Sequence, residues 1–191
     1  MLFLAILIAL LFGIAMYFII IYNNLISLKN TVSKNWANID VLLKQRYSEL
    51  PKLIDAAKEY MQYERGTFEK IVEARKAAVT AVDAKDLVAL SEAESTLKSN
   101  LTKLFALAEN YPDLKTNEAF HRLQVRISDL ETEIADRREL YNDSVYRNNI
   151  RINQFPDLIV ARIFHFGSFQ LLKFEPSEIE DVSVGQQFKT S

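Results

Sequence analysis

The chain has 191 residues, a formal net charge of -2, four glycines, four prolines and no cysteine. The slightly acidic balance provides no basic field for nucleic acid, and no lysine- and arginine-rich run alternates with aromatic residues, which argues against nucleic-acid binding. Without cysteine there is neither a disulfide framework nor a cysteine-linked lipid anchor. The scarcity of glycine and proline beside many Leu, Ala, Glu and Lys predicts an all-α fold.

Residues 1–21 form a continuous apolar stretch, MLFLAILIALLFGIAMYFIII, without a charged side chain. A helix of this length spans about 30 Å, the thickness of the hydrocarbon core of a bilayer. A cleaved signal peptide is the alternative, but it would have a basic start, a shorter apolar core and a small-residue exit. We therefore predict a transmembrane anchor over residues 1–21.

Small residues recur every four positions within this stretch, at Ala5, Ala9 and Gly13. This spacing places them on one helix face, where a second helix can approach closely. They are candidate contacts in a homo-oligomer, and the alternative is a chance pattern of residues that are common in membrane spans.

The charges beside the anchor indicate its orientation. Lys29, Lys34, Lys44 and Arg46 follow the span, whereas no Lys or Arg precedes it. The positive-inside rule then predicts a single-pass protein of the bacterial inner membrane with a cytoplasmic domain.

Residues 22–155 are predicted to form an antiparallel bundle of about four long helices. Apolar residues advance by three or four from Leu25 to Met61, with Trp36 in the stripe, so the anchor should continue as a stalk into the first bundle helix. Pro51 lies inside this pattern and predicts a kink, because it removes a backbone donor and crowds the preceding turn.

Turn and cap residues separate the next helices. A second helix is predicted over residues 63–82, and Asp86 is a suitable N-cap for a third. The third helix should end at Tyr111-Pro112, because proline cannot continue a helix and disfavours helical geometry at the residue before it.

The fourth helix is predicted to begin at the N-cap Thr116 and to end at Phe155, with an apolar period of 3.5 that is typical of a coiled coil. Arg138 and Asn148 are polar residues in its inward seam, on either side of Tyr141. Such residues either reach out to solvent or bond to a facing helix and set the register; a buried binding site is the alternative.

One pattern resembles part of a metal site. Glu118 and His121 have the Glu-x-x-His spacing of di-iron helical bundles, which require a second copy of the motif. The other histidine, His165, has the cation Arg162 three residues before it. We therefore expect no metal, no cofactor and no catalytic residue, and four scattered glycines build no phosphate-binding loop.

Several ordered blocks between about residues 22 and 175 resemble the LemA family of bacterial membrane-anchored helical proteins. The matching residues are Tyr22 to Leu25 (YNNL), Trp36 to Asp40 (WANID), Arg46-Tyr47, Leu50-Pro51, Glu73 to Arg75 (EAR), Ala108 to Asn117 (AENYPDLKTN), Leu140-Tyr141-Asn142 with Val145, and Phe155-Pro156. The sequence departs from the family at Ser48-Glu49, where Asp-Leu is usual, and at Phe164-His165-Phe166, where Phe-Gly-Phe is usual.

The resemblance implies one membrane span and a soluble antiparallel bundle without an assigned enzymatic activity. One member of the family is associated with the formation of magnetosome membranes, which implies a structural or membrane-organising role.

Residues 156–174 form a phenylalanine-rich segment that a soluble bundle does not account for. Charged residues interrupt it, so it is a poor second membrane crossing. It folds back onto the bundle, lies in the membrane interface, or docks on another copy or another protein. We favour contact with lipid or with a neighbouring subunit, because a fourth antiparallel helix runs back towards the membrane. The candidate contact residues are Arg162, Phe164, Phe166, Phe169 and Lys173. Residues 175–191 are predicted to be a flexible, acidic and polar tail.

These observations predict a non-enzymatic membrane-anchored scaffold that assembles with itself or organises partners and lipid at the bilayer. The alternatives are an adaptor or regulatory subunit of a membrane enzyme such as a protease, which would have a membrane protein as partner, and an enzyme in its own right.

Overall fold

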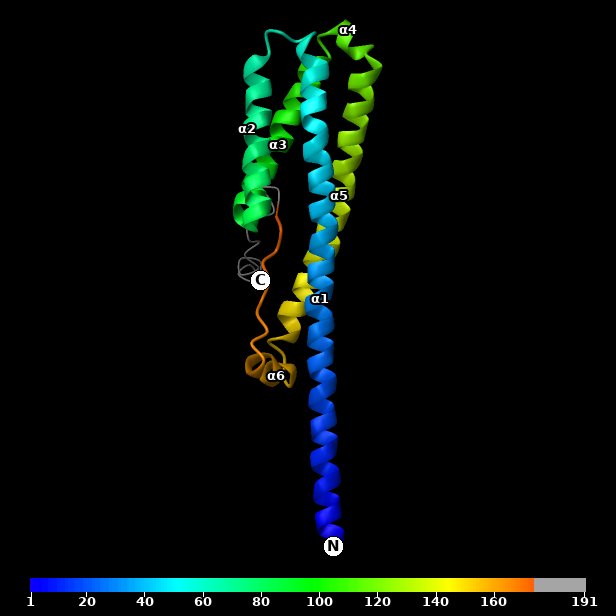
Figure 1. The fold of residues 1–191 in the computed structure, drawn as a ribbon, viewed down its shortest axis with the longest axis vertical. Helices are drawn as coiled ribbons and strands as arrows, with labels where there is room; N and C mark the ends of the chain where they lie inside the picture. The colour runs from blue at the N-terminus through cyan, green and yellow to red at the C-terminus, as the bar shows by residue number, and fades with distance from the viewer. Residues whose placement is uncertain (174–191) are drawn as a thin grey trace, which may run out of the picture. The chain divides into compact units, whose positions relative to one another are not determined.

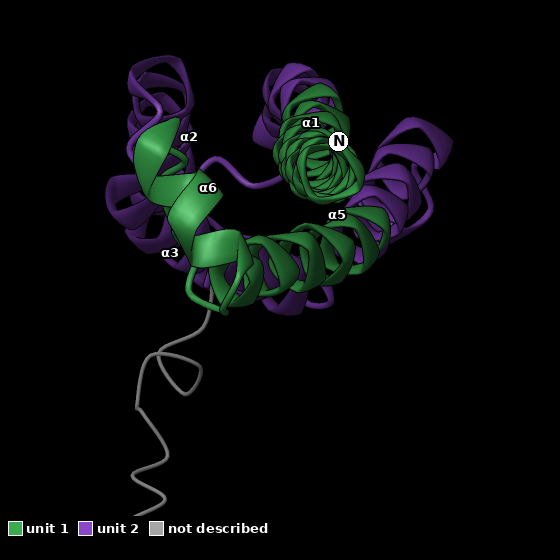
Figure 2. Cartoon of the chain, turned by 90° about the horizontal axis from the view of Figure 1, so that it is seen from below, with its two compact units in different colours: residues 1–42, 133–171 green, residues 43–132, 172–191 purple. Residues whose placement is uncertain are grey.

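The computed structural model describes residues 1–173, and within them it is all-helical, which confirms the predicted fold class (Figure 1). The six helices are α1 (Leu2–Lys58), α2 (Arg65–Ala84), α3 (Leu87–Ala108), α4 (Pro112–Lys115), α5 (Glu118–Arg151) and α6 (Asp157–Ile163). The chain divides into two compact units, shown in Figure 2. Unit 1 contains Met1–Leu42 and Glu133–Leu171, and unit 2 contains Leu43–Thr132 and the chain from Leu172 onward.

Helix α1 joins the apolar N-terminal stretch and the first helix of the domain without interruption. It has 57 residues, and it continues through Pro51, so this proline does not end it. Its apolar part is long enough to cross a membrane. Only 6% of the most apolar 18-residue stretch of this helix is buried within the protein. The apolar surface of this segment is therefore not covered by the rest of the described chain.

Unit 2 packs α2, α3 and parts of α1 and α5 around aliphatic side chains. Its largest fully buried residues are Leu43, Leu50, Leu53, Met61, Ile71, Leu90, Leu97, Leu101, Leu104 and Leu114. The predicted cap of α3 is confirmed, because the Asp86 carboxylate accepts the backbone N–H groups of Val88 and Ala89 at 3.1 and 3.0 Å. Just before it, Lys85 adopts a left-handed conformation that ends α2.

The prediction that Thr116 caps the fourth helix is wrong. Residues Pro112–Lys115 form the short helix α4, and Thr116 belongs to the end of this helix. The cap position passes to Asn117, whose side-chain oxygen accepts the Phe120 N–H at 3.0 Å. Proline at the first helical position favours this extra turn, because its missing N–H is not needed there.

Unit 1 pairs the first part of α1 with the second part of α5 and with α6. Its buried apolar residues are Ile21, Leu25, Val32, Ile39, Ile134, Tyr141, Val145, Ile152, Val160 and Ala161. The Trp36 ring lies against Tyr141, with 5.8 Å between the ring centroids. Helix α5 ends at Arg151 rather than at Phe155, and Phe155 is 81% exposed instead of forming part of the seam. Pro156 instead precedes a new helix, α6, which the sequence pattern did not predict.

Candidate functional site

A buried ion-pair cluster joins three helices within unit 2. Arg46 on α1 pairs with Glu94 on α3, and both residues are less than 5% exposed. The neighbouring Tyr47 hydroxyl donates a hydrogen bond of 2.5 Å to the other carboxylate oxygen of Glu94. Glu131 on α5 lies 3.8 Å from the Arg46 guanidinium. One cation thus lies between two carboxylates in an otherwise aliphatic interior.

The environment of this cluster changes its proton affinities. Burial opposes the charge of Arg46, but the Glu94 carboxylate outweighs burial and holds the pKa of the guanidinium above its ordinary value. Burial, reinforced by Glu94, raises the pKa of the Tyr47 phenol well above its usual range. Burial also raises the pKa of Glu131, although Arg46 opposes this effect. The cluster therefore holds a permanent ion pair and a tyrosine that keeps its proton, which suits alignment of helices better than proton transfer.

Sequence analysis missed Glu94. On the apolar face of α3, Leu90 and Leu97 are seven residues apart. Glu94 occupies the position between them on the same face. A charged residue at an inward position, with an arginine in a facing helix, was the available signal.

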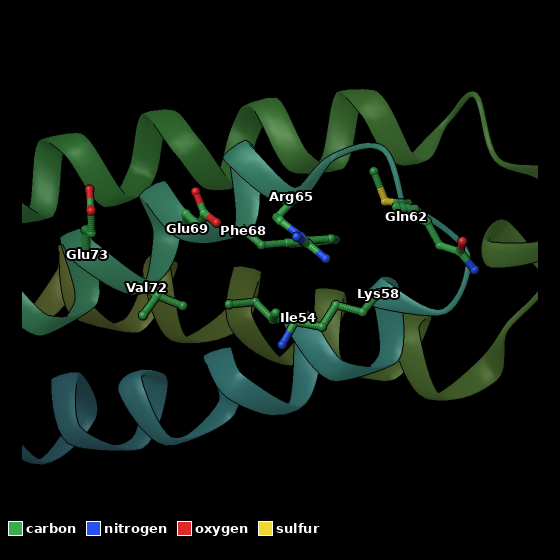
Figure 3. A pocket seen from close by; sticks show the side chains of 9 residues that line it. Ile54, Lys58, Gln62, Arg65, Phe68, Glu69, Val72 and Glu73 are labelled. Atoms are coloured by element: carbon green, nitrogen blue, oxygen red, sulfur yellow. The ribbon is translucent and has the colours of Figure 1, made fainter.

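An open groove of about 900 Å³ lies in unit 2 between the end of α1 and the start of α2 (Figure 3). Its lining combines apolar and charged side chains, which are Ile54, Lys58, Met61, Gln62, Arg65, Phe68, Glu69, Val72 and Glu73. Its lining contains no histidine, serine, threonine or cysteine, so it has no hydroxyl or thiol nucleophile and no imidazole base.

The residues of the Glu-x-x-His pattern lie on the surface. Glu118 pairs with Arg122 at 3.1 Å, and His121 and His165 are both exposed. Within residues 1–173, no three His, Cys, Asp or Glu side chains gather closely enough to hold a metal ion.

In unit 1, the chain after α6 returns along α5 as an extended segment, residues 164–171, here called the return segment (Figure 1). The side-chain amide of Asn149 holds this segment through both of its polar atoms. Its oxygen accepts the Phe169 N–H at 3.0 Å, and its nitrogen donates to the Phe169 carbonyl at 2.9 Å. The Asn148 amide donates to the Gly167 carbonyl at 3.3 Å, and the Tyr141 hydroxyl donates to the Gln170 carbonyl at 3.0 Å. Side chains of α5 thus supply hydrogen bonds that a second strand would otherwise provide.

The polar residues predicted for the inward seam of α5 lie in different surroundings. Asn148 is buried, but its amide bonds to the return segment and to Asn149 rather than to a facing helix. Arg138 and Asn142 are half-buried in α5. Sequence analysis missed Asn149, and the adjacent pair of amides in an amphipathic helix was the only signal for it.

Helix α6 ends in a left-handed residue at His165, where the LemA pattern usually has glycine. The N–H of His165 donates to the Arg162 carbonyl at 3.4 Å, and the N–H of Phe166 donates to the Ala161 carbonyl at 2.9 Å. These are the two bonds of a Schellman motif, so the turn forms although the glycine is replaced.

The predicted contact residues occupy different environments. The rings of Phe164 and Phe166 lie 4.7 and 5.8 Å from the Tyr22 ring of α1, and Phe164 remains 56% exposed. Phe169, within the return segment, and Lys173, the last described residue, are half-buried, whereas Arg162 is exposed. Ala5, Ala9 and Gly13 are exposed on α1, away from this cluster. Phe174 and the predicted tail lie outside the described residues.

The substitution Tyr47→Phe should change the response of stability to alkaline pH. The folded protein holds the Tyr47 proton above about pH 10, where the unfolded chain releases it, so this stabilisation is complete below pH 10 and is lost as the pH rises further. The variant should lose stability less steeply above pH 10, by up to about 1.4 kcal/mol per pH unit. Urea unfolding of the full chain in detergent micelles on both sides of pH 10 measures this difference.

Tyr63→Phe is the matched control, because Tyr63 is exposed. This variant should show the same pH dependence of stability as wild type. Tyr141, whose pKa burial also raises, is present in all three proteins, so the alkaline slope decreases without vanishing. Equal alkaline slopes in wild type and Tyr47→Phe would contradict the buried, protonated state of Tyr47.

The substitution Asn149→Ala should release the return segment. It removes both hydrogen bonds to the Phe169 backbone, each of which contributes about 0.5–1.5 kcal/mol, so the Phe169 amide should exchange its hydrogen roughly ten- to a hundredfold faster. Hydrogen exchange with mass spectrometry on the full chain measures this rate. As a control, Asn153→Ala removes only a side-chain bond from the residues after α5 to the Asn149 carbonyl, and it should leave the exchange of Phe169 unchanged. Equal exchange rates of Phe169 in Asn149→Ala and wild type would show that the Asn149 side chain, here called the Asn149 clamp, does not hold the return segment.

The amino-acid sequence is similar to those of several known proteins. The model of the LemA family matches residues 35–185. Protein LemA of Metamycoplasma hominis is 29% identical over 163 residues, which are 85% of this chain and 72% of the relative. Magnetosome protein MamQ of Magnetospirillum gryphiswaldense is 20% identical over 88% of this chain and 70% of its own length. Magnetosome protein MamQ 2 of Paramagnetospirillum magneticum is 27% identical over 53% of this chain and 37% of its own length. The match covers both units and confirms the resemblance, so the chain belongs to the LemA family.

Proposed function

We propose that this protein is a non-enzymatic, single-pass membrane scaffold whose helical domain assembles with copies of itself at the bilayer. The observation that carries the proposal is the continuity of α1, in which an apolar segment long enough to cross a membrane passes directly into a bundle helix. A domain connected in this way has no flexible linker to its anchor, so its position relative to the bilayer is defined by one helix.

The polar features of the described chain support a structural role. The buried charges of Arg46 and Glu94 neutralise each other between helices, and the lining of the groove in Figure 3 contains no serine, threonine, cysteine or histidine. Two of the relatives compared above are named magnetosome proteins, and a membrane scaffold is compatible with that name.

The orientation of the proposed anchor follows from the charges after it. Lys29 and Lys34 lie close behind the span, which favours a cytoplasmic domain in a bacterial inner membrane. Protease added to intact spheroplasts should leave the domain whole and should digest it after lysis. Digestion before lysis would establish the opposite orientation and contradict the positive-inside assignment.

Self-assembly is proposed to use the small-residue face of the anchor, Ala5, Ala9 and Gly13. This face is exposed, and a Cβ at Gly13 would meet no atom within 4 Å, so the described chain does not occupy the space in front of it. Small residues permit close contact between helix backbones in lipid, where the hydrophobic effect does not drive association.

The substitution Gly13→Ile should reduce assembly, because its branched side chain separates the two helix backbones. Leu11→Ile is the matched control, since residue 11 lies on the opposite side of the helix. Because the natural chain lacks cysteine, a single introduced cysteine reports crosslinking in native membranes without background. Equal crosslinking in the two variants would remove this face from the interface.

The composition of the detergent-extracted particle separates the scaffold from an adaptor of a membrane enzyme. A particle containing many copies of this chain alone supports the scaffold. A stoichiometric complex with a different membrane protein supports the adaptor.

A further inference from the structure

Helix α6 has apolar residues on two opposite faces, and the protein covers only one of them. Val160 and Ala161 are buried against Ile21 and Leu25 of α1 and against Ile152, which follows the end of α5. On the opposite side, Ile159 and Ile163 lie one turn apart and are 40% and 59% exposed. A short helix that only filled the core would carry polar residues on its outer face.

The position of α6 along α1 coincides with the end of the apolar stretch. Its packing partners on α1 are Ile21 and Leu25, with Phe18, Tyr22 and Leu28 at the edge of the cluster. The first charged side chain after the N-terminus is that of Lys29, so all these residues precede the first side-chain charge. Tyrosines and phenylalanines at this level are typical of the boundary between hydrocarbon and headgroups.

The direction of α6 also fits the membrane surface. Figures 1 and 2 show α6 lying across the axis of α1 within unit 1. If α1 crosses the bilayer, a helix that lies across its axis near the end of the apolar stretch runs along the interface. Interfacial helices place apolar side chains in the acyl boundary and extend cations to the headgroups.

From these observations, which rest on the proposed membrane anchoring, we infer that α6 is an in-plane membrane contact that inserts Ile159, Ile163 and the neighbouring Phe164 among phospholipids. Phe164 contributes because its ring packs on Tyr22 and still leaves half of its surface exposed. Arg162, exposed between the two isoleucines in sequence, is placed to pair with anionic headgroups. The Asn149 clamp and the Schellman turn at His165 hold α6 from its C-terminal side.

The partner is lipid rather than a second copy, because the exposed face continues the apolar surface of the anchor. Phe18 and Tyr22 connect the two surfaces, so any bilayer that receives residues 1–21 also reaches α6. This refines the sequence-based candidates: Ile159 and Ile163 join Phe164 and Arg162, whereas Phe166 and Phe169 serve the fold of unit 1.

Single-cysteine labelling of the full chain tests the contact. Cysteine replaces Ile159, Ile163, Leu11 or Val72 one at a time, and each carries a polarity-sensitive fluorophore after reconstitution into vesicles of phosphatidylcholine and phosphatidylglycerol. All four positions are exposed, so the labels do not disturb the core. Leu11 reports the anchor, and Val72 reports the surface of α2.

We expect the probes at Ile159 and Ile163 to be quenched severalfold more by phosphatidylcholine with a nitroxide near the headgroup end of the acyl chain than the probe at Val72. They should also be shielded from aqueous iodide. Accessibility to iodide equal to that at Val72 would overturn the contact, and shielding from iodide and nitroxide alike would overturn it in favour of a protein cover. Lipid quenching at Leu11 alone would refute the α6 contact while leaving the anchor intact; no lipid quenching even at Leu11 would refute the anchoring itself.

Discussion

The N-terminal half of α1 has apolar side chains that the described chain leaves almost wholly uncovered, and this hydrophobic surface constrains everything that follows it. Leaving many large aliphatic and aromatic side chains in water is unfavourable by roughly 1.5–3 kcal/mol each. A lipid bilayer removes that cost, and the same helix then continues into the domain without a joint. On the proposed membrane anchoring, the segments that pack on α1 near the end of its apolar part, above all α6, would be held at a defined depth relative to the bilayer surface.

Unit 1 also shows how a helical protein holds an extended segment. The backbone groups of α5 are already bonded within the helix, so they cannot form a ladder with residues 164–171. Asn149 solves this problem because its side-chain amide has the donor and acceptor geometry of a peptide group. It bonds both backbone groups of Phe169, while Asn148 and Tyr141 bond carbonyls on either side.

Unit 2 contains a buried ion pair between Arg46 and Glu94. The free-energy cost of burying these charges is linked to the specificity with which they align the helices. An arginine and a glutamate removed from water gain little net stability, but losing one partner would leave an unpaired charge in the interior, at about 3–5 kcal/mol. The pair of Arg46 and Glu94, with Tyr47 bonded to the same carboxylate, therefore disfavours alternative alignments of α1 and α3. A purely aliphatic interface would tolerate a shift by one helical turn more easily.

The sequence by itself determined those features that depend on neighbouring residues. Apolar spacing established the helices, the length of the uncharged stretch indicated a span, and the Asp86 cap of α3 followed from a carboxylate placed just before an apolar run. The left-handed conformation of His165 is not predicted in this way. It costs about 1–2 kcal/mol in a residue other than glycine, and no local sequence rule indicates it.

Only the tertiary structure decided the features that join distant parts of the chain. Glu94 became the partner of Arg46 across 48 residues, and Asn149 became a clamp for Phe169 across 20 residues. The same is true of the end of α5 at Arg151 and the formation of α6, whose buried face exists only because Ile21, Leu25 and Ile152 meet it. The physical reason is that a side chain's periodic position shows that it points inward, whereas the partner it meets there depends on packing between segments that local sequence rules do not relate.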